Sequence, residues 1–534
     1  MNKLAELLFP NVKETVDDIL KKYPSDNKVR TRFAPSPTGF LHIGGVYTAL
    51  ICKKIAEKEN GIFYLRIEDT DKKREVEGSV NLITKLLNKF NIIPNEGINN
   101  EGPYKPYIQS QRVNIYHVFA KYLVEKGYAY PCFASEEDLE NIRLTQQQNK
   151  ENPGYYGKYA LYRDKTYEEY QELLEKNKKF VLRFKVPDKI EERVSVDDLI
   201  KGHIEFENNY NDFVLLKENG IPTYHFAHAI DDSLMHTTYV IRGDEWLSSV
   251  PIHLQLFKAL SFDTPKYAHV APIMKLDGES RRKLSKRKDL EASAEYYLNE
   301  GYPIDSLHIY LLTLINSNFE GWYLENKDKD YNLFEVSFEH MAKSGALYDL
   351  DKLKNISSDI IYNDNDLYNN FLNWAKEYNK DLYNLVSTNL DELKNILNTQ
   401  GENSHEKRKD LHFYNEFLSK FGYFYDDIYY NSNINYKEEL KDIIDIDLCI
   451  KTIPLILENI DLPVKEINEK LGFVNKKKYD KDPSLYQGTN VQIFKLFRIV
   501  LTNSESGISL EDTMNILGKD KIIERFNYVL NKLK

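Results

Sequence analysis

The sequence predicts a parallel α/β domain that is interrupted by an insertion and followed by an all-helical region. Between residues 29 and 108, strand-like apolar segments alternate with helix-like segments, and this order is typical of a parallel sheet with helical crossovers. From about residue 291 onward, Leu, Ile, Phe and Tyr recur at spacings of three and four, which favours helices. A chain of 534 residues is too long for one hydrophobic core, so we expect about three to five domains.

The first strand leads into a turn and a helix that are typical of a site for nucleotide phosphates. Residues 29–34 form the expected strand, Pro and Gly residues stiffen the turn, and the helix opens at Gly44 and Gly45. Glycine lets a backbone approach a flat base or a phosphate, and a helix start presents free N–H groups. We expect His42 to add a side-chain donor. A second apolar strand over residues 63–67 ends in an acidic cluster that begins at Glu68.

The segment 109–212 interrupts the α/β pattern. It begins with a helix over 113–126 and carries a polar helix and a β-like stretch over 180–186. The α/β pattern is expected to resume in four later segments, which are 212–216, 223–229, 237–241 and the amphipathic helix 247–260. Two distant parts of the chain are therefore predicted to complete one sheet around a shared site.

The composition argues against a membrane protein and against a thiolate metal site. No apolar run approaches the ~20 residues that a membrane span needs, and the first residues lack the features of a signal peptide, so we expect a cytoplasmic protein. Cys52, Cys132 and Cys449 are scattered without Cys-x-x-Cys spacing, which predicts neither a disulfide framework nor a zinc site.

The net charge of −11 does not exclude a nucleic-acid partner, because binding depends on local charge. Basic runs occur at 281–283, 286–288, 407–409 and 476–478. A run of this kind is usually a solvated face. The first coincides with a motif, which sets it apart.

Six segments in order resemble the glutamyl-tRNA synthetases of bacterial type, which are class I aminoacyl-tRNA synthetases. The decisive pair is Arg32-Phe-Ala-Pro-Ser-Pro-Thr-Gly39, running into His42-Ile-Gly44, and Lys283-Leu-Ser-Lys-Arg287. These two segments resemble the class I signatures His-Ile-Gly-His and Lys-Met-Ser-Lys-Ser in the variant forms that glutamyl-tRNA synthetases use. The other matches are Leu65-Arg-Ile-Glu-Asp-Thr-Asp71, Gln109-Ser-Gln-Arg112 with Tyr116, Pro222-Thr-Tyr-His225 and Val240-Ile-Arg-Gly-Asp-Glu-Trp246.

The resemblance implies a two-step reaction and a domain order. Glutamate attacks the α-phosphate of ATP to give glutamyl-adenylate, and a terminal ribose hydroxyl of tRNA-Glu then takes the glutamyl group. The implied fold is a Rossmann-type α/β catalytic domain with an α+β insertion, followed by all-α regions. The implied parts are an N-terminal helical extension (1–28), the first half of the catalytic fold (29–108), an acceptor-stem-binding insertion (109–212), the second half (213–290), a stem-contact region (291–356) and an anticodon-binding region (357–534).

For ATP, the resemblance implies contacts from both signatures and the Mg²⁺ that accompanies the nucleotide. The implied ATP-binding residues are His42, Gly44, Gly45, Glu245, Lys283, Leu284, Ser285, Lys286 and Arg287. Those expected to act in catalysis are His42, Gly44, Gly45, Lys283 and Lys286. Phosphoryl chemistry needs positioning and charge stabilisation more than acid–base groups, which suits this set.

For glutamate, two carboxylates need two cationic donors and the ammonium needs an acid. Arginine binds carboxylates through a planar fork, so Arg32 and Arg242 suit the first role and Glu68 suits the second. The remaining implied contacts are Ala34, Ser36, Tyr224, His228 and Trp246. His228 departs from the Asn or other small polar group of several family members. Some members hold zinc in the insertion, but Cys132 stands alone there, so no structural zinc is expected.

Three other interpretations remain open at this point. A glutaminyl-tRNA synthetase typically reads Pro-Glu-Pro-Asn-Gly where this chain reads Pro35-Ser-Pro-Thr-Gly39, and its C-terminal part is a β-barrel in the eukaryotic type. A truncated relative that glutamylates a modified tRNA base lacks the helical region that follows Asp351 here. A catalytically inactive tRNA-binding module would have no reason to keep the catalytic set together.

The range of tRNA substrates depends on one position. In family members that reject tRNA-Gln, an arginine before an aromatic pair is thought to read the third anticodon base. The segment 419–425 places Gly422 there, which favours an enzyme that charges both tRNA-Glu and tRNA-Gln, unless Lys420 or another cation does the reading. The family suggests a monomer.

Overall fold

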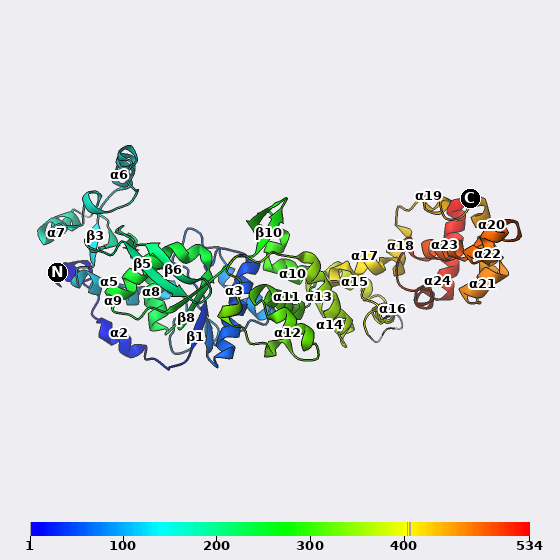
Figure 1. Cartoon of the computed structure of the whole chain (residues 1–534), viewed down its shortest axis with the longest axis horizontal. Coiled ribbons are helices and arrows are strands. Elements are labelled where there is room, and N and C mark those ends of the chain that lie inside the picture. Colours follow the sequence, from blue (N-terminus) through cyan, green and yellow to red (C-terminus); the bar gives the residue numbers. More distant parts are fainter. Residues whose placement is uncertain (1, 177, 286, 403, 405–406) are drawn as a thin grey trace. The chain divides into compact units, whose positions relative to one another are not determined.

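The computed structural model describes residues 2–176, 178–285, 287–402, 404 and 407–534 (Figure 1). The chain divides into two compact units. The first comprises Met1–Tyr296 with His308–Asp349, and the second comprises Tyr297–Leu307 with Leu350–Lys534.

The core of the first unit is a four-stranded parallel sheet with strand order β2-β1-β8-β9. The strands are β1 (Arg30–Phe33), β2 (Ile62–Leu65), β8 (Tyr239–Gly243) and β9 (Lys266–Val270). Helix α3 (Ile43–Lys58) connects β1 to β2, and α9 (Val250–Leu260) lies between β8 and β9 in sequence. The chain proceeds outward in opposite directions from the central pair β1 and β8. Parallel sheets bind ligands at such a reversal, beyond the carboxyl ends of the strands.

This sheet confirms that two distant parts of the chain complete one fold, but the segment 212–216 does not belong to it. Strand β7 (Val214–Leu216) pairs antiparallel with β4 (Val181–Phe184), in a separate sheet of order β3-β4-β7 whose first strand is β3 (Ala129–Cys132). The prediction that the parallel pattern resumes there is therefore wrong. A short apolar run shows that a strand is buried but not which sheet it joins.

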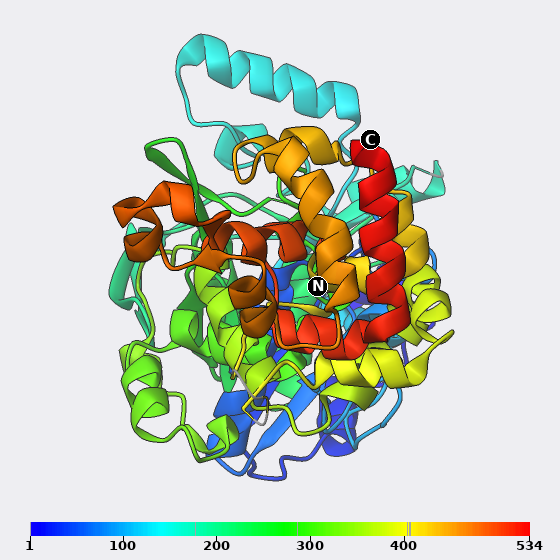
Figure 2. The same cartoon turned by 90° about the vertical axis from the view of Figure 1, so that its right-hand side faces the viewer.

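The insertion adds three α-helices, two 3-10 helices and a hairpin to this second sheet. Its elements are η1 (Gln109–Arg112), α5 (Val113–Glu125), α6 (Glu136–Asn149), η2 (Gly157–Tyr159), α7 (Tyr167–Glu175), β5 (Arg193–Asp198) and β6 (Gly202–Glu207). Helix α6 stands away from the sheets in both views (Figures 1 and 2). Most of its residues are exposed, but Ile142 packs in a small aromatic cluster that includes Tyr155 and Tyr159, and Gln146 exchanges hydrogen bonds with the Gly154 backbone.

Two short helices precede the sheet, as residues 1–28 predict. Helices α1 (Asn2–Leu8) and α2 (Val16–Lys22) pack against α5 through buried Ala5, Phe9 and Ile19. Tyr23 is also buried, and the Arg112 guanidinium carbon lies 5.4 Å from the centre of its ring. This segment therefore contributes to the core of the first unit.

Further helices and one hairpin complete the chain before residue 350. They are α4 (Ser79–Lys89), α8 (Tyr224–Leu234), η3 (Asp244–Ser249), β10 (Met274–Asp277), β11 (Ser280–Lys283), η4 (Leu290–Ala292), α10 (Ala294–Glu300), α11 (Ile304–Ile315), α12 (Phe319–Glu325), η5 (Tyr331–Leu333) and η6 (Phe338–His340). Strands β10 and β11 form an antiparallel hairpin that ends at Lys283. The hairpin thereby fixes where the second class I signature begins.

The second unit is largely helical, as predicted. Its longer elements are α13 (Leu350–Tyr362), α14 (Leu367–Tyr378), α15 (Lys380–Val386), α16 (Leu390–Leu397), α17 (Phe417–Phe421), α18 (Asp426–Tyr430), α19 (Tyr436–Lys441), α20 (Ile446–Glu458), α21 (Val464–Lys470), α22 (Lys476–Lys481), α23 (Asn490–Thr502) and α24 (Leu510–Leu533). Figure 2 shows the chain turning sharply within the red α24. The turn lies at Gly518, whose φ of 73° is in the left-handed region that favours glycine.

The fold class is confirmed: a parallel α/β catalytic domain precedes a mainly helical region. Among the described residues, no helix is both long and apolar enough to cross a membrane.

Asp212 offers a test of how the insertion is held together. Its buried carboxylate accepts hydrogen bonds from Arg163 Nη1 (2.6 Å), the Tyr130 hydroxyl (2.7 Å) and the Val186 amide (2.9 Å). Asp212→Ala leaves the buried Arg163 without its main counter-charge, so we expect the free energy of unfolding to fall by about 3–5 kcal/mol.

The matched control is Asp188→Ala, which removes the exposed carboxylate that also pairs with Arg163. An exposed ion pair contributes only about 0–1 kcal/mol, so this variant should unfold nearly like the parent. Urea unfolding followed by circular dichroism, with limited proteolysis to locate the loss, makes the comparison. Equal destabilisation by the two variants would contradict the assignment.

Candidate active site

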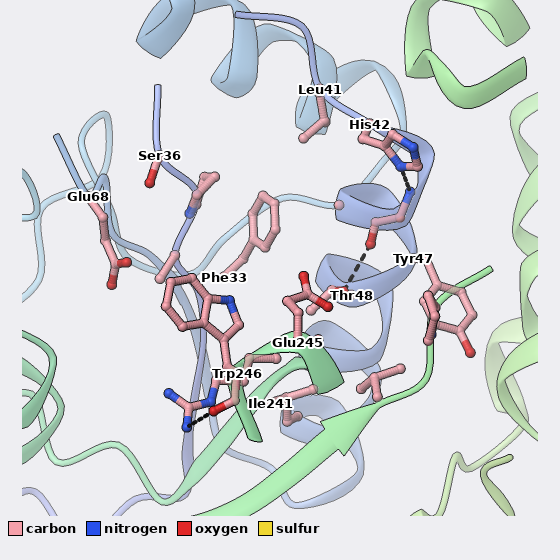
Figure 3. A pocket seen from close by; sticks show the side chains of 18 of the residues that line it. Phe33, Ser36, Leu41, His42, Tyr47, Thr48, Glu68, Ile241, Glu245 and Trp246 are labelled. Carbon is pink, nitrogen blue, oxygen red and sulfur yellow. Dashed lines mark hydrogen bonds between the residues drawn. The ribbon is translucent and has the colours of Figure 1, made fainter. Parts of the chain in front are cut away.

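A cavity of about 470 Å³ lies at the carboxyl ends of β1 and β8 (Figure 3). Most of the sequence-predicted site residues line it, and these are Arg32, Ala34, Ser36, His42, Gly44, Gly45, Glu68, Tyr224, Arg242, Glu245, Trp246 and Lys283. In Figure 3, His42 and the start of α3 lie on one side of the cavity and Glu68 lies on the other. The cavity therefore has a helix-start end and a charged end.

At the helix-start end, His42 is the N-cap of α3, and its Nδ1 accepts a hydrogen bond from the Gly44 amide at 2.8 Å. A side chain at Gly45 would place its Cβ 2.9 Å from Leu41 Cδ1, which is closer than real contacts allow. A side chain at Gly45 would therefore require the Leu41 side chain to shift. The first turn of α3 lines the cavity, and the positive end of the helix dipole suits an anion, while the amides of Gly44 and Gly45 donate to His42.

His42 also joins the two class I signatures. Because its Nδ1 accepts from Gly44, its Nε2 carries the proton and donates to the Leu284 carbonyl at 3.2 Å. Leu284 is buried, and its own amide donates to the Ile273 carbonyl. The signatures therefore meet, but both ring nitrogens of His42 have partners within the chain.

The segment after β11 is rich in cations with different surroundings. Lys283 is exposed, and its Nζ lies 3.4 Å from a carboxylate oxygen of Glu245 across the cavity. Ser285 donates its amide to Asp289, which also pairs with Arg282. Arg287 is exposed and, like Leu284 and Ser285, does not line the cavity. Lys286 lies outside the described residues.

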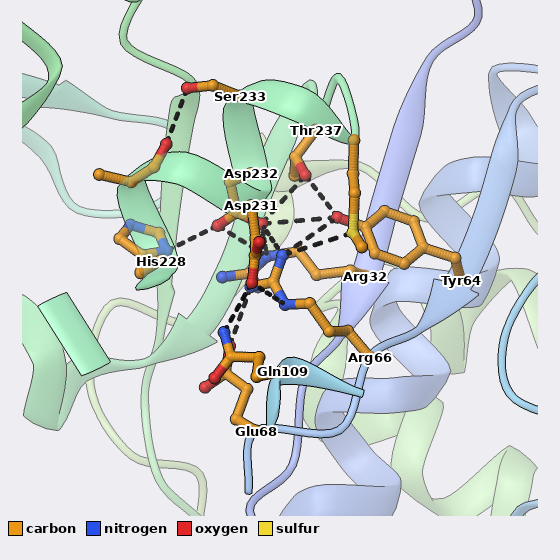
Figure 4. A network of polar contacts seen from close by, with 12 residues as sticks. Arg32, Tyr64, Arg66, Glu68, Gln109, His228, Asp231, Asp232, Ser233 and Thr237 are labelled. Carbon is orange, nitrogen blue, oxygen red and sulfur yellow. Dashed lines mark hydrogen bonds and ion pairs between the residues drawn. The ribbon is translucent and has the colours of Figure 1, made fainter. Parts of the chain in front are cut away.

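At the charged end, a buried ion-pair network holds Arg32 (Figure 4). Arg32 Nε donates to Asp232 at 3.1 Å and its Nη1 donates to the Ile241 carbonyl at 3.0 Å. Arg66 bridges Asp232 (2.7 Å) and Glu68 (2.9 Å). Burial alone would raise the pKa of Asp232, but Arg32 and Arg66 hold it well below its usual range. Burial raises the pKa of Glu68 despite Arg66.

The adjacent Asp231 explains the role of Gln109, Arg112 and Tyr116, which form one of the six segments that resemble the family. Gln109 Nε2 donates to its carboxylate at 2.9 Å, Arg112 Nε at 2.7 Å and the Tyr116 hydroxyl at 2.7 Å. These groups are buried and do not line the cavity. Their role is to fix α8, and with it Asp232, against η1 and α5.

Arg242 has different surroundings from Arg32. Its Nε donates to His269 Nε2 at 3.0 Å, its Nη1 to the Tyr224 hydroxyl at 3.2 Å, and its Nη2 approaches His253 Nδ1 at 3.3 Å and the Trp246 carbonyl at 3.5 Å. Within the described part of the chain, no carboxylate pairs with it directly. The sequence reasoning did not identify His253 and His269, which lie outside the matched segments.

Tyr224 and Trp246 form a wall of the cavity, with ring centres 4.2 Å apart. His228 differs from expectation because it does not line the cavity. One helical turn beyond Tyr224, it stacks behind that ring, and its Nδ1 lies 2.6 Å from Asp232. Burial lowers the pKa of His228 to about 3. His228 therefore supports the wall and the ion-pair network rather than facing a ligand.

Gly422 lies in the second unit, buried in the short helix η8 (Gly422–Phe424). A Cβ there would lie 3.3 Å from Ile428 and 3.8 Å from Leu418, so a side chain at this position would start toward the interior. Lys420 is exposed. The Lys420 side chain is thus more accessible to solvent than a side chain at position 422 would be.

Cys132 is buried, and its Sγ lies 3.3 Å from the Tyr155 hydroxyl. Among the described residues, no group of three or more His, Cys, Asp or Glu side chains is arranged to hold a metal ion.

Comparison with known proteins agrees with this geometry. Residues 28–353 match the model of the family "tRNA synthetases class I (E and Q), catalytic domain". A glutamate–tRNA ligase of Clostridium perfringens is 44% identical over 99% of both chains, and that of Bacillus subtilis is 32% identical over 94% of this chain and 100% of its own.

Solved structures extend the likeness to the whole chain. The glutamate tRNA ligase of Elizabethkingia meningosepticum, solved in complex with its amino acid, superposes with a TM-score of 0.73 at 28% identity. The match covers 95% of this chain and 100% of that one. With the two signatures meeting at one cavity and relatives matched from end to end, the chain belongs to the glutamate–tRNA ligases, within the E and Q group of class I tRNA synthetases.

Proposed function

We propose that this glutamate–tRNA ligase binds L-glutamate between Arg32 and Arg242 and ATP at the start of α3, and that it charges both tRNA-Glu and tRNA-Gln. The observation that carries the first part is that both arginines face one cavity whose other end is a helix N-terminus. Use of ATP follows from membership of class I.

Glutamate recognition rests on complementary charge. The two arginines supply donors for the two carboxylates, and Glu68, buried at the same end, supplies the acceptor for the ammonium. Because Arg242 donates to the Tyr224 oxygen, the Tyr224 hydroxyl proton is left for a carboxylate of the substrate. Ala34 and Ser36 line the cavity after β1 and suit backbone and hydroxyl contacts, while Trp246 closes the wall.

Activation joins a glutamate carboxylate oxygen to the α-phosphorus of ATP, and pyrophosphate leaves. Gly44 and Gly45 carry no side chain and would let the phosphates approach the start of α3 closely, and Lys283 and Lys286 would stabilise charge as it develops. Mg²⁺ would accompany the nucleotide. A ribose hydroxyl at the 3′ end of the tRNA then attacks the adenylate carbonyl carbon, and AMP leaves.

His42 can serve a phosphate only after a local change. Its Nε2–H donates to the Leu284 carbonyl, so that bond must open before the same proton reaches an oxygen of ATP. We infer that ATP binding shifts the segment from Lys283 to Arg287. Leu284, Ser285 and Arg287, which do not line the cavity, would approach the nucleotide in that second arrangement.

The other parts of the chain have proposed roles by position. Residues 109–212 would hold the acceptor stem, 291–356 would contact the stem, and 357–534 would bind the anticodon, while 1–28 would support packing. We propose a monomer acting in the cytoplasm, where ATP and tRNA are available.

The glutamate assignment is tested by Arg32→Lys. Lysine keeps the charge but loses the planar fork that pairs with carboxylates, so we expect the KM for glutamate to rise more than the KM for ATP. Steady-state aminoacylation with each substrate varied measures both. An unchanged KM for glutamate with a raised KM for ATP would place Arg32 at the wrong end of the cavity.

The second signature is tested by Lys286→Ala. A cation that acts on the transition-state phosphate stabilises the transition state more than the bound substrates. Losing about 3–4 kcal/mol of that stabilisation should lower the aminoacylation rate by orders of magnitude, while the affinities for glutamate and ATP stay nearly the same. The matched control is Lys288→Ala, an exposed lysine two residues later in the sequence, which should keep most activity. Near-parental turnover of the Lys286 variant would refute the role.

The absence of structural zinc is a further expectation. Cys132 is the single cysteine of the insertion and is buried beside Tyr155. Treatment with EDTA should therefore leave the enzyme folded, and adding Mg²⁺ back should restore aminoacylation. Elemental analysis after gel filtration gives the direct measurement. Stoichiometric zinc would contradict the proposal.

The tRNA range is tested with purified transcripts. Gly422 supplies no arginine to distinguish C from G at the third anticodon base, so we expect both tRNA-Glu and tRNA-Gln to be glutamylated. Since a side chain at this buried position would start toward the interior, any discrimination would come from a neighbour such as the exposed Lys420. An unrelated tRNA is the control, under conditions where tRNA-Glu reaches its plateau. If tRNA-Gln is charged no better than the control, the enzyme is discriminating, and exposed Lys420 becomes the next candidate for the reading residue.

A further inference from the structure

We propose that Asp198 and His269 are positioning residues that orient Arg242 for a glutamate carboxylate, which makes a hairpin of the insertion part of the amino-acid site. The inference rests on the proposed role of Arg242 in binding glutamate. It concerns residues that neither of the two signatures contains, because Asp198 ends β5 in the insertion and His269 lies in β9.

The three side chains form a buried relay of hydrogen bonds. An arginine only donates, so His269 Nε2, 3.0 Å from Arg242 Nε, must present a lone pair. The imidazole proton is then on Nδ1, which donates to Asp198 Oδ2 at 2.7 Å. Arg242, His269 and Asp198 are 5%, 0% and 4% exposed, so water cannot replace a lost partner easily. The carboxylate thus selects the tautomer that Arg242 requires.

Asp198 is itself held in one orientation. Its Oδ1 accepts hydrogen bonds from the amides of Ile200 (2.9 Å) and Lys201 (2.8 Å), which close the turn of the β5–β6 hairpin. The Leu199 amide donates to the Tyr267 carbonyl of β9, and Lys201 Nζ donates to Asp244 at 3.1 Å, just beyond β8. The hairpin turn is therefore attached to both strands that carry the relay.

The relay also leaves the charge of Arg242 unbalanced. Its direct partners are two imidazoles, a hydroxyl and a carbonyl, whereas Arg32 pairs directly with Asp232. His253 Nδ1 accepts from Arg242, so its Nε2 donates to His225 at 3.0 Å, and burial keeps the pKa values of both histidines low. Asp198 acts on Arg242 only through a neutral ring. The guanidinium is thus rigid but still available to one incoming carboxylate, which favours glutamate over an uncharged amide.

This arrangement makes Asp198→Asn an informative variant. Each carboxylate oxygen accepts two hydrogen bonds, Oδ1 from the amides of Ile200 and Lys201 and Oδ2 from the amide (3.0 Å) and Nδ1 of His269, so an amide nitrogen opposes two donors at either position. At the Oδ2 position it faces the imidazole N–H directly. The imidazole proton would move to Nε2 and oppose the Arg242 N–H. An isosteric change outside the cavity would therefore disturb the glutamate-binding arginine.

The experiment compares Asp198→Asn with Asp197→Asn in steady-state aminoacylation of tRNA-Glu. Asp197 is the neighbouring residue, and its carboxylate is 90% exposed beside His203. For Asp198→Asn we expect the KM for glutamate to rise about tenfold or more, with the KM for ATP within about twofold, because one buried hydrogen bond to a charged group is lost. For Asp197→Asn both values should stay near the parent.

A pair of variants at His269 gives an independent measure. In His269→Gln the side-chain oxygen can still accept from Arg242 Nε, whereas His269→Leu offers no acceptor. The glutamine variant should therefore retain a lower KM for glutamate than the leucine variant at a similar melting temperature. This pair decides the question if Asp198→Asn does not fold.

Two results would overturn the proposal. One is an unchanged KM for glutamate in Asp198→Asn, and the other is an equal rise for glutamate and ATP together with a lower melting temperature, which is what a purely structural role predicts. Arg242→Lys separates this failure from that of the proposed function. If Arg242→Lys raises the KM for glutamate while the relay variants do not, Arg242 binds glutamate without help from Asp198.

Discussion

The adjacent carboxylates of Asp231 and Asp232 hold the catalytic domain together. Both belong to α8, in the second part of the split fold, while Arg32 and Arg66 belong to the first part and Arg112 to the start of the insertion. The three arginines are almost fully buried, and a buried guanidinium is tolerated only when a carboxylate and further acceptors satisfy it. Neither part can therefore bury its own charges without the other, and the cavity forms only where they meet.

The two ends of the cavity are built in different ways. The charged end is formed by side chains on strands and on α8, each held by buried partners, so its geometry is set before any substrate arrives. The end near α3 receives the exposed side chain of Lys283, the last residue of the β10–β11 hairpin. One end of the cavity is thus fixed by buried partners, whereas at the other Lys283 forms an exposed ion pair with Glu245.

Much of this could be predicted from the sequence, and the exceptions have physical reasons. The ordered motifs located the arginines, Glu68 and the α3 turn, because each motif places its residues at the end of a strand. The motif containing Tyr224 also suggested His228 as a ligand contact, but a residue one helical turn later stacks behind the tyrosine instead. Spacing in the sequence does not show whether a residue faces the cavity or packs behind a residue that faces it.

The sequence did not predict which residues far apart in the chain would contact one another. Asp198, His253 and His269 are far apart in the sequence and become neighbours only when the insertion hairpin joins β9. The segment 212–216 was assigned to the wrong sheet for the same reason. Hydrophobic periodicity shows which face of a strand is buried, but tertiary packing decides which strand it pairs with.

The hydrogen bond from His42 to Leu284 has an energetic consequence for the nucleotide. On the proposed role of His42, the donor that would serve ATP has the Leu284 carbonyl as its acceptor in this structure, so the binding-competent arrangement would be reached only by opening that bond. The apparent affinity for ATP is then weaker than the intrinsic affinity by the fraction of molecules that are competent. A change that weakens the Leu284 contact would tighten ATP binding without touching any atom of the nucleotide.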